Sequence, residues 1–140
     1  LWEETGLALG QPGPWPDAPA DWQGFAATGN RPDAAGLSFV FRAITPPGEV
    51  RRYDTRFFAV NRTAIAAEID VTDEELGSVA WQRLADIETL NAARITQLIA
   101  RDFADALQAS GEIAADRPVP FYYYSDAGFR RDLIAHATVN

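Results

Sequence analysis

The chain has 140 residues, of which 47% are hydrophobic, and this length and composition predict one globular domain or most of one. Its formal net charge is −8 and all its cations are arginines, which argues against a general nucleic-acid-binding role and against binding to anionic membranes. It has no cysteine and a single histidine, His136, so disulfides, thiolate metal sites, a cysteine nucleophile and a histidine-based catalytic triad are excluded.

The longest apolar runs are far shorter than the roughly 20 residues of a membrane span. We therefore expect a soluble protein, and a cytoplasmic location is the default expectation for it. Any metal ion must be held by oxygen ligands. Because an acidic surface repels free phosphates, a phosphate-bearing substrate would have to be bound through a metal ion or through locally placed arginines.

The first seven residues, Leu1 to Leu7, have the pattern of a helix end. No N-cap residue stands ahead of Leu1, and Gly6 lies where a left-handed C-terminal cap is expected. The residues before Gly6 therefore predict the last turn of a helix whose earlier turns are missing, which implies that the domain is truncated at its N-terminus.

The segment 10–20 contains four prolines and two glycines and is predicted to be a surface loop, because this composition disfavours both helix and central strand. We expect Trp15 and Trp22 to anchor the loop. A short helix over Asp21–Ala27, capped by its first residue, is predicted to end at Gly29.

Two apolar and aromatic segments predict neighbouring strands. Leu37–Ile44 has the length and composition of a buried strand, and Thr45–Gly48 stops it with a turn. Thr55–Val60 is the second, and the short charged linker between them favours antiparallel pairing. A third short strand is predicted over Ser78–Leu84, after a cluster of acids in a turn at Asp70–Glu75.

The clearest helical pattern runs from Asn91 to Ala109, where apolar residues recur at spacings of three and four and predict a helix with one buried face, closed by Gly111. Phe121–Tyr124 and Phe129–Arg131, joined by the Ser125–Gly128 turn, predict a hairpin. Short strands, one long helix and loops together predict an α/β or α+β fold.

The opening residues also carry a family resemblance. Leu1-Trp2-Glu3-Glu4-Thr5-Gly6-Leu7 resembles the closing half of the Nudix box, the motif of the Nudix hydrolase superfamily, whose pattern is G-x5-E-x7-R-E-U-x-E-E-x-G-U with U an aliphatic residue. Glu3 and Glu4 take the positions of the paired glutamates and Gly6 that of the glycine. The first glycine, the first glutamate and the Arg-Glu pair of the pattern would lie before residue 1.

Other segments are similar to features that often follow the box in this family, namely an aromatic strand, an acidic turn, a strand ending W-x-x-L and a long helix: Arg56–Phe58, Asp73–Leu76, Trp81–Leu84 and the helix beginning near Asn91. The resemblance implies a Nudix-type mixed sheet sandwiched between helices. It places the Nudix domain at residues 1–110, without its N-terminal strands and the first half of the box, and a C-terminal extension with a small hairpin at 111–140.

The chemistry of such a site needs carboxylates. Cleavage of a pyrophosphate requires a divalent cation that neutralises the oxygens and positions an attacking water, and Mg²⁺ and Mn²⁺ prefer carboxylate oxygens. In the family the paired glutamates are metal ligands, a role that the resemblance carries to Glu3 and Glu4. Without the motif, the same pair would be interpreted as two solvated charges on a helix surface.

Further candidate residues come from the acidic turn and the strands. Family members often supply another carboxylate from a loop, which points to Glu75 ahead of Glu74, and the alternative is an ordinary acidic turn. Arg42 and Arg56 could bind substrate phosphates through their forked guanidinium groups. Equally, these arginines could pair with acids or stand on an exposed face of the sheet.

The aromatic residues are predicted to be structural rather than functional. Phe57, Phe58 and Trp81 are assigned to the core in preference to a base-stacking platform, and Tyr122–Tyr124 to a half-buried strand. His136, near the C-terminal end, has no predicted catalytic role.

The resemblance implies hydrolysis of the pyrophosphate bond of a nucleoside diphosphate derivative with Mg²⁺ or Mn²⁺. The expected partner is a small nucleotide-derived molecule, with no nucleic acid and no membrane, and homodimerisation is left open. Because the usual base or additional metal-binding glutamate belongs to the Arg-Glu pair before Leu1, the chain as it stands would be weakly active or inactive.

Two alternatives remain open. The Thr45-Pro46-Pro47 turn and the Tyr53–Phe58 run are similar to segments of family members related to coenzyme A diphosphatases. The other alternative is a Nudix-like domain without catalysis that serves as a ligand sensor or a protein-interaction module.

Overall fold

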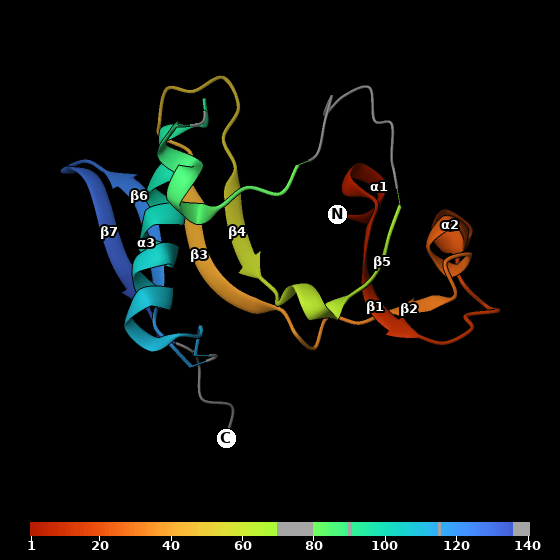
Figure 1. Ribbon diagram of the computed structural model, residues 1–140. Coiled ribbons are helices and arrows are strands. Elements are labelled where there is room, and N and C mark those ends of the chain that lie inside the picture. The colour runs from red at the N-terminus through yellow and green to blue at the C-terminus, as the bar shows by residue number, and fades with distance from the viewer. Residues whose placement is uncertain (70–79, 90, 115, 136–140) are drawn as a thin grey trace. The chain divides into compact units, whose positions relative to one another are not determined.

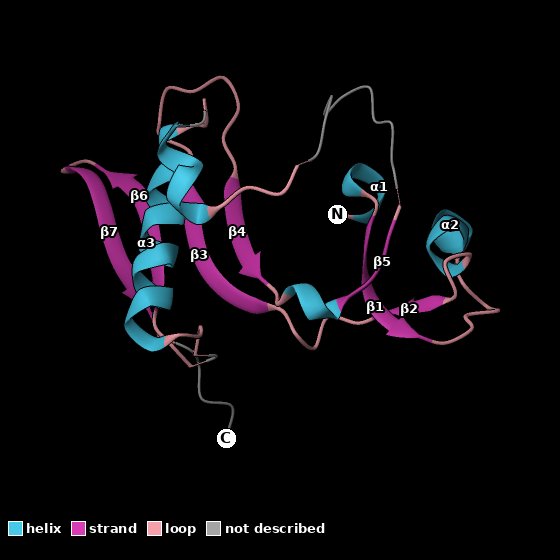
Figure 2. Ribbon diagram, in the orientation of Figure 1, coloured by secondary structure: helices cyan, strands magenta, loops and turns pink. Residues whose placement is uncertain are grey.

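The computed structural model describes residues 1–69, 80–89, 91–114 and 116–135. The chain divides into two compact units (Figure 1). Unit 1 comprises Leu1–Leu37 and Val60–Trp81, and unit 2 comprises Ser38–Ala59 and Gln82–Asn140. Each unit contains a sheet and helical segments, so the predicted mixture of α and β structure is confirmed (Figure 2).

Unit 1 is built on a three-stranded antiparallel sheet of order β2-β1-β5. Its elements are α1 (Trp2–Thr5), β1 (Leu7–Pro12), the 3-10 turn η1 (Ala20–Trp22), α2 (Gln23–Ala26), β2 (Asn30–Pro32), the 3-10 turn η2 (Arg62–Ala64) and β5 (Ile65–Glu68). The predicted helix end is confirmed, because α1 stops at Gly6 with φ 68° in the left-handed region that glycine adopts readily.

The loop predicted over residues 10–20 is wrong in its first part, because β1 extends to Pro12 and is the central strand of this sheet. β5 pairs with Leu7–Leu9 and β2 pairs with Gly10–Pro12, so the proline meets a neighbour on one side only. A proline is tolerated at the end of a strand where a second partner strand is missing. The glycines and prolines of this segment therefore do not prevent a strand, although their abundance predicted a loop.

The loop that follows is anchored by aromatic rings, as predicted. Trp15 packs edge-on against Trp22 with ring centroids 5.9 Å apart, and Trp22 does the same against Phe25 at 5.8 Å. Phe25 is buried and also meets Trp2 of α1 at 5.5 Å. The predicted helix over Asp21–Ala27 is present as η1 followed by α2, but no side chain caps it, so the capping role given to Asp21 is wrong.

Unit 2 contains a four-stranded mixed sheet of order β4-β3-β6-β7, with β3 and β6 parallel and the other pairs antiparallel. Its elements are β3 (Ser38–Ile44), β4 (Asp54–Ala59), the 3-10 segment η3 (Leu84–Thr89), α3 (Arg94–Ser110), β6 (Val119–Ser125) and β7 (Gly128–Ile134). The first two strands with their antiparallel pairing, the long helix with Gly111 at its end, and the hairpin are all confirmed.

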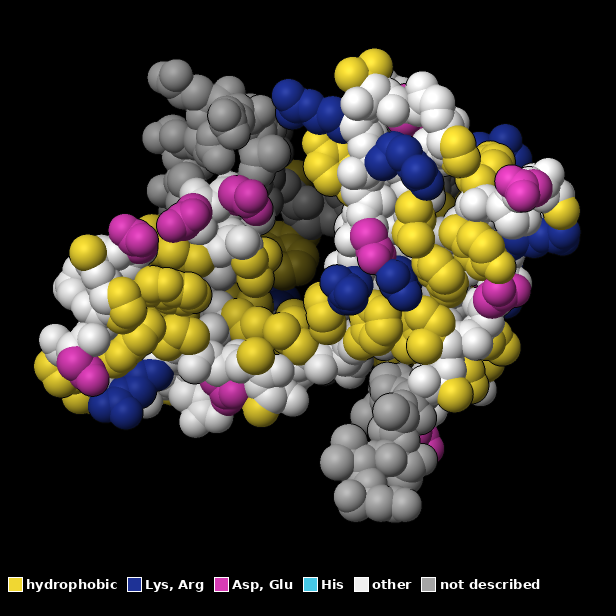
Figure 3. All heavy atoms as spheres, turned by 180° about the vertical axis from the view of Figure 1, so that it is seen from behind, with side chains coloured by type: hydrophobic (Ala, Val, Ile, Leu, Met, Phe, Trp, Pro, Cys, Tyr) yellow, Lys and Arg dark blue, Asp and Glu magenta, His cyan; other side chains and the backbone are white. Residues whose placement is uncertain are grey.

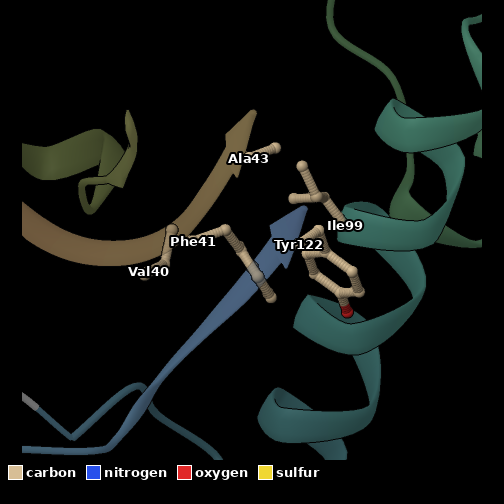
Figure 4. Packing of buried hydrophobic residues seen from close by; sticks show 5 residues of the cluster. All are labelled: Val40, Phe41, Ala43, Ile99 and Tyr122. Atoms are coloured by element: carbon tan, nitrogen blue, oxygen red, sulfur yellow. The ribbon is translucent and has the colours of Figure 1, made fainter. Parts of the chain in front are cut away.

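The core of unit 2 lies between β3, β6 and α3, and Figure 4 shows side chains from these three elements pointing toward one another. Its buried members are Val40, Phe41, Ala43, Ile99 and Tyr122. Val40 and Phe41 are both buried although they are consecutive, because the register of β3 against β4 shifts between Phe39 and Phe41, which is the signature of a bulge.

A polar network ties α3 to the hairpin beside this core. The Tyr122 hydroxyl donates to the Asp102 carboxylate, and Arg131 donates to the same carboxylate from Nη2 at 2.9 Å and from Nε at 3.1 Å. Burial, followed by the hydrogen bond to Asp102, raises the pKa of Tyr122. The network therefore connects β6, β7 and α3 through hydrogen bonds in which the Asp102 carboxylate accepts from both Tyr122 and Arg131.

Three other predictions need correction. The strand predicted over Ser78–Leu84 is absent from its described part, since residues 80–83 have no regular structure and Leu84 opens η3. Phe58 and Trp81 are more than half exposed, so neither belongs to the core, whereas Phe57 does pack against the core of unit 2. Phe58 alternates with Phe57 along β4 and so faces the other side of the sheet.

Trp81 is instead held in a small polar cluster of unit 1. Its indole Nε1 donates to Glu68 at 3.3 Å, and the Arg62 guanidinium lies 4.9 Å from its ring centroid. Arg62 also approaches Glu68 at 3.6 Å. The cluster links Trp81 to η2 and β5 at the surface.

The Nudix-type arrangement, with helices on both sides of one sheet, stays a prediction, as does the domain boundary near residue 110. The acidic turn at Asp70–Glu75 lies outside the described residues. Within the described ranges, none of the helices combines the length and apolar character that crossing a membrane requires.

Candidate functional site

The paired glutamates lie at the end of the short helix α1. Glu3 and Glu4 are both exposed, and Glu4 lies 3.6 Å from the amino group of Leu1. The N–H of Gly6 donates to the carbonyl of Trp2 at 2.9 Å and closes the turn that carries the pair. Consecutive residues of a helix point about 100° apart, so the two carboxylates face neighbouring directions over the same helix end.

Two carboxylates suit part of a magnesium site, because Mg²⁺ is commonly bound through one or two carboxylates and completes its shell with water or substrate oxygens. Over the described ranges, no group of three or more acidic or histidine side chains is arranged to hold a metal ion. Glu74 and Glu75 lie outside the described residues, so the predicted third carboxylate stays a prediction.

The two arginines predicted to bind substrate are brought together in unit 2. Arg42 on β3 and Arg56 on β4 are direct cross-strand partners, so they share one face of the sheet. Phe41, the neighbour of Arg42, belongs to the core under α3. Because side chains alternate along a strand, the two arginines lie on the face of the sheet away from α3.

Two like charges opposite each other in a sheet repel, and Asp54 offsets this repulsion. Arg42 forms a bidentate pair with the carboxylate of Asp54, with Nε donating to Oδ1 at 2.8 Å and Nη2 donating to Oδ2 at 2.6 Å. The Arg42 guanidinium also lies 4.7 Å from the ring centroid of Phe121 on β6. These contacts fix the guanidinium in place, and within the described part of the chain its other N–H groups have no hydrogen-bond acceptor.

This part of the surface can be followed in Figure 3, which shows unit 2 from the side away from α3 with basic and acidic side chains beside one another among hydrophobic ones. The Phe121 ring stacks on Tyr123 with centroids 4.7 Å apart, and Phe39 packs against Phe58 at 5.6 Å. The arginine pair is therefore flanked by aromatic rings on the same face of the sheet.

The hydrogen bond from Arg42 is the largest cause of a lowered pKa at Asp54. Burial opposes it, and the charges of Arg42 and Arg56 add to the lowering. A carboxyl group with a lowered pKa in the folded state stabilises the fold above its unfolded pKa, and this stabilisation is lost as pH falls through the folded value. The pH range in which this stabilisation is lost therefore lies below pH 3.8, the ordinary pKa of an aspartate.

We expect the Asp54→Asn variant to lose less stability than the unsubstituted chain as pH is lowered through this window, because an amide has no charge to lose. The measurement is the urea midpoint of unfolding at several pH values between neutrality and the acid limit of folding. Other carboxylates titrate in both proteins, so the difference between them isolates Asp54. Parallel curves would show that the Arg42 pair contributes no pH-dependent stability.

The structure therefore unites Arg42 and Arg56 within unit 2, whereas Glu3 and Glu4 belong to unit 1. Pairing with an acid was one of the alternatives left open for Arg42, and the structure shows this pairing with Asp54. Sequence reasoning missed Asp54, although its position two residues before Arg56 in a strand already places both on one face.

Comparisons with known proteins identify no family for this chain. No protein-family model matches the chain, no curated protein matches its sequence, and no solved structure matches its fold.

Proposed function

We propose that the chain is part of a Nudix-type hydrolase that cleaves the pyrophosphate bond of a nucleoside diphosphate derivative with the help of Mg²⁺ or Mn²⁺. The observation that carries the proposal is the helix end at residues 1–7. Glu3 and Glu4 lie in the last turn of α1, and Gly6 adopts the left-handed conformation directly after it. A helix that ends at this glycine is what the resemblance to the closing half of the Nudix box implies, and it supports the proposal.

In this proposal Glu3 and Glu4 would hold the metal ion through their carboxylates. When bound, the ion supplies neutralisation of the phosphate oxygens and a polarised water molecule. The water oxygen would attack phosphorus as the bridging P–O bond breaks, the leaving phosphate would keep the bridging oxygen, and a base would accept the proton of the water. Glu75 is the candidate among the residues of this chain for a further ligand or for orienting the water.

Arg42 and Arg56 have the chemistry for binding the phosphate groups. Guanidinium groups match phosphate oxygens in a forked geometry, and the pair supplies two such groups on one face of a sheet. Asp54 neutralises one of the two charges, which lets the arginines stand opposite each other before any phosphate binds. Within unit 2, Phe121 and Tyr123 add flat apolar surface next to Arg42.

The test is magnesium-dependent phosphate release, coupled to a phosphatase, from ADP-ribose, NADH, nucleoside triphosphates and coenzyme A. The protein to assay is a chain extended upstream of Leu1, because the Nudix pattern places its first glutamate and its Arg-Glu pair there. We expect the Glu3→Gln/Glu4→Gln variant to lose at least about tenfold in rate and to bind Mg²⁺ more weakly, because both carboxylate ligands are gone.

The matched control is Glu49→Gln/Glu112→Gln, which removes the same two charges from other exposed positions and should keep its rate. Cleavage of coenzyme A in preference to the other compounds would favour the coenzyme A diphosphatase-like alternative. A folded, extended protein that binds Mg²⁺ and cleaves none of the panel would contradict the hydrolase and favour the sensor or interaction module.

A further inference from the structure

The hairpin strand β7 forms one edge of the sheet of unit 2 and lies beyond β6 in Figure 1. The two-residue turn between Ser125 and Gly128 closes the hairpin with a hydrogen-bonded pair, and bonded and non-bonded pairs alternate from there along an antiparallel ladder. Phe129, Arg131 and Leu133 therefore direct their backbone N–H and C=O groups away from β6, toward the open edge.

Natural edge strands are usually protected from pairing with another chain by proline, by bulges, by charged side chains or by being very short. Of these devices β7 carries only charges, at Arg130, Arg131 and Asp132. β7 has seven residues, no proline and an uninterrupted register against β6. Phe129 and Leu133 are also 46% and 58% exposed, although they are large and apolar. Among the residues that the structure describes, no strand pairs with this edge, which combines free backbone groups with apolar side chains that a partner strand could cover.

The sequence of β7 is complementary to itself when it is read in the antiparallel direction. With the two-fold axis at Arg131, Arg130 of one copy lies opposite Asp132 of the other, and the same ion pair forms a second time by symmetry. Phe129 lies opposite Leu133 of the other copy, again twice. Side chains directly opposite in an antiparallel pair are close enough for both kinds of contact.

At the two-fold axis of this register, two like-charged arginine side chains would meet, and contacts within each copy offset their repulsion. Arg131 would stand opposite its own copy, but its guanidinium is already held by Asp102 at 2.9 Å and by the Tyr122 hydroxyl at 3.2 Å. Asp132 accepts from the Tyr123 hydroxyl through Oδ2 at 2.7 Å, which leaves Oδ1 for the second copy. The like charges at the axis are therefore neutralised from within each copy.

Neighbouring registers lose this complementarity. A shift of one residue puts Arg130 opposite Arg131 and sets the α3 face of one sheet against the opposite face of the other. A shift of two residues places Arg130 or Asp132 opposite itself and leaves no ion pair between them.

The other edge of the sheet, β4, is less suited to such pairing. Its acid is Asp54, and both carboxylate oxygens of Asp54 already accept from Arg42, so neither is left for a second copy.

From these observations we propose that β7 is a homodimer interface, in which the strand pairs antiparallel with β7 of a second copy about a two-fold axis at Arg131. The pairing joins two four-stranded sheets into one continuous sheet and covers Phe129 and Leu133. It does not depend on the proposed hydrolase activity, because it uses neither the glutamates of α1 nor the arginine pair of β3 and β4.

The test is a charge-reversal series on the full chain, with the dimer dissociation constant measured by sedimentation velocity over a range of concentrations. Arg130→Asp and Asp132→Arg each place like charges opposite each other at two symmetric positions, and each should raise the dissociation constant at least about tenfold. The double variant Arg130→Asp/Asp132→Arg restores both ion pairs in reversed order and should return it to within about threefold of the original.

Tyr123→Phe is the matched control, because it removes the hydrogen bond to Asp132 without changing any charge, and it should leave the dimer intact. Circular dichroism of every variant checks that the hairpin still folds. A chain that is monomeric at every concentration tested overturns the proposal. A dimer that the single reversals leave unchanged, or that the double variant fails to restore, also overturns it, because the contact then lies elsewhere.

Discussion

Replacing Phe41 by alanine is expected to destabilise unit 2 by about 3–5 kcal/mol, the range observed when a buried phenylalanine is truncated. The Phe41 side chain is completely buried between β3 and α3, where it meets Phe103 at 6.4 Å and carries the Arg117 guanidinium 5.4 Å from its ring. Truncation leaves a cavity that the strand and the helix cannot close without shifting. It also removes the ring under a partly buried guanidinium.

The measurement is urea unfolding followed by far-ultraviolet circular dichroism, to which α3 contributes the longest helix. Phe58→Ala is the matched control, because Phe58 belongs to the same sheet but is 54% exposed on its other face. We expect it to cost about 1 kcal/mol or less. Equal losses in the two variants would mean that Phe41 is not the centre of the core.

Replacing Gly10 by alanine is expected to destabilise unit 1 by about 3 kcal/mol through overpacking. A Cβ atom at Gly10 would lie 2.3 Å from the carbonyl oxygen of Arg31 and 3.2 Å from the ring of Phe25. The first of these neighbours is backbone of the paired strand β2, which cannot move aside as a flexible side chain could. Separation of β1 from β2 is the expected consequence.

Tryptophan fluorescence reports on this change, because Trp2, Trp15, Trp22 and Trp81 all belong to unit 1. Gly24→Ala in α2 is the matched control. A Cβ there meets only the indole nitrogen of Trp2, at 3.9 Å, and alanine favours the helix by up to about 1 kcal/mol over glycine. A Gly10→Ala variant as stable as the Gly24→Ala variant would contradict the close approach of β1 and β2.

Local signals in the sequence were sufficient for several elements. The spacing of apolar residues located α3, with its first turn beginning at Arg94 rather than Asn91. Glycines marked the ends of α1 and α3 because both positions need a left-handed backbone, with φ 68° at Gly6 and 76° at Gly111. The turn residues between two aromatic segments located the β6–β7 hairpin.

Elements without a strong pattern of their own escaped prediction. β2 and β5 have only three and four residues, which is too short for an alternating pattern to stand out. β1 was hidden by Gly10 and Pro12, whose composition is typical of a loop. Its strand conformation comes from two partners, each of which pairs with one half of β1.

For the candidate site, the sequence by itself determined the residue types: paired glutamates at a helix end, and arginines within two strand segments. Only the tertiary structure decided that Arg42 stands opposite Arg56 and above Phe121, because the register of β3 with β4 includes a bulge and the pairing of β3 with β6 joins segments far apart in the chain. Hydrophobic periodicity and glycine positions are encoded locally. Strand register and neighbour order depend on which faces can be buried together, and that is settled only when the whole sheet packs against α3.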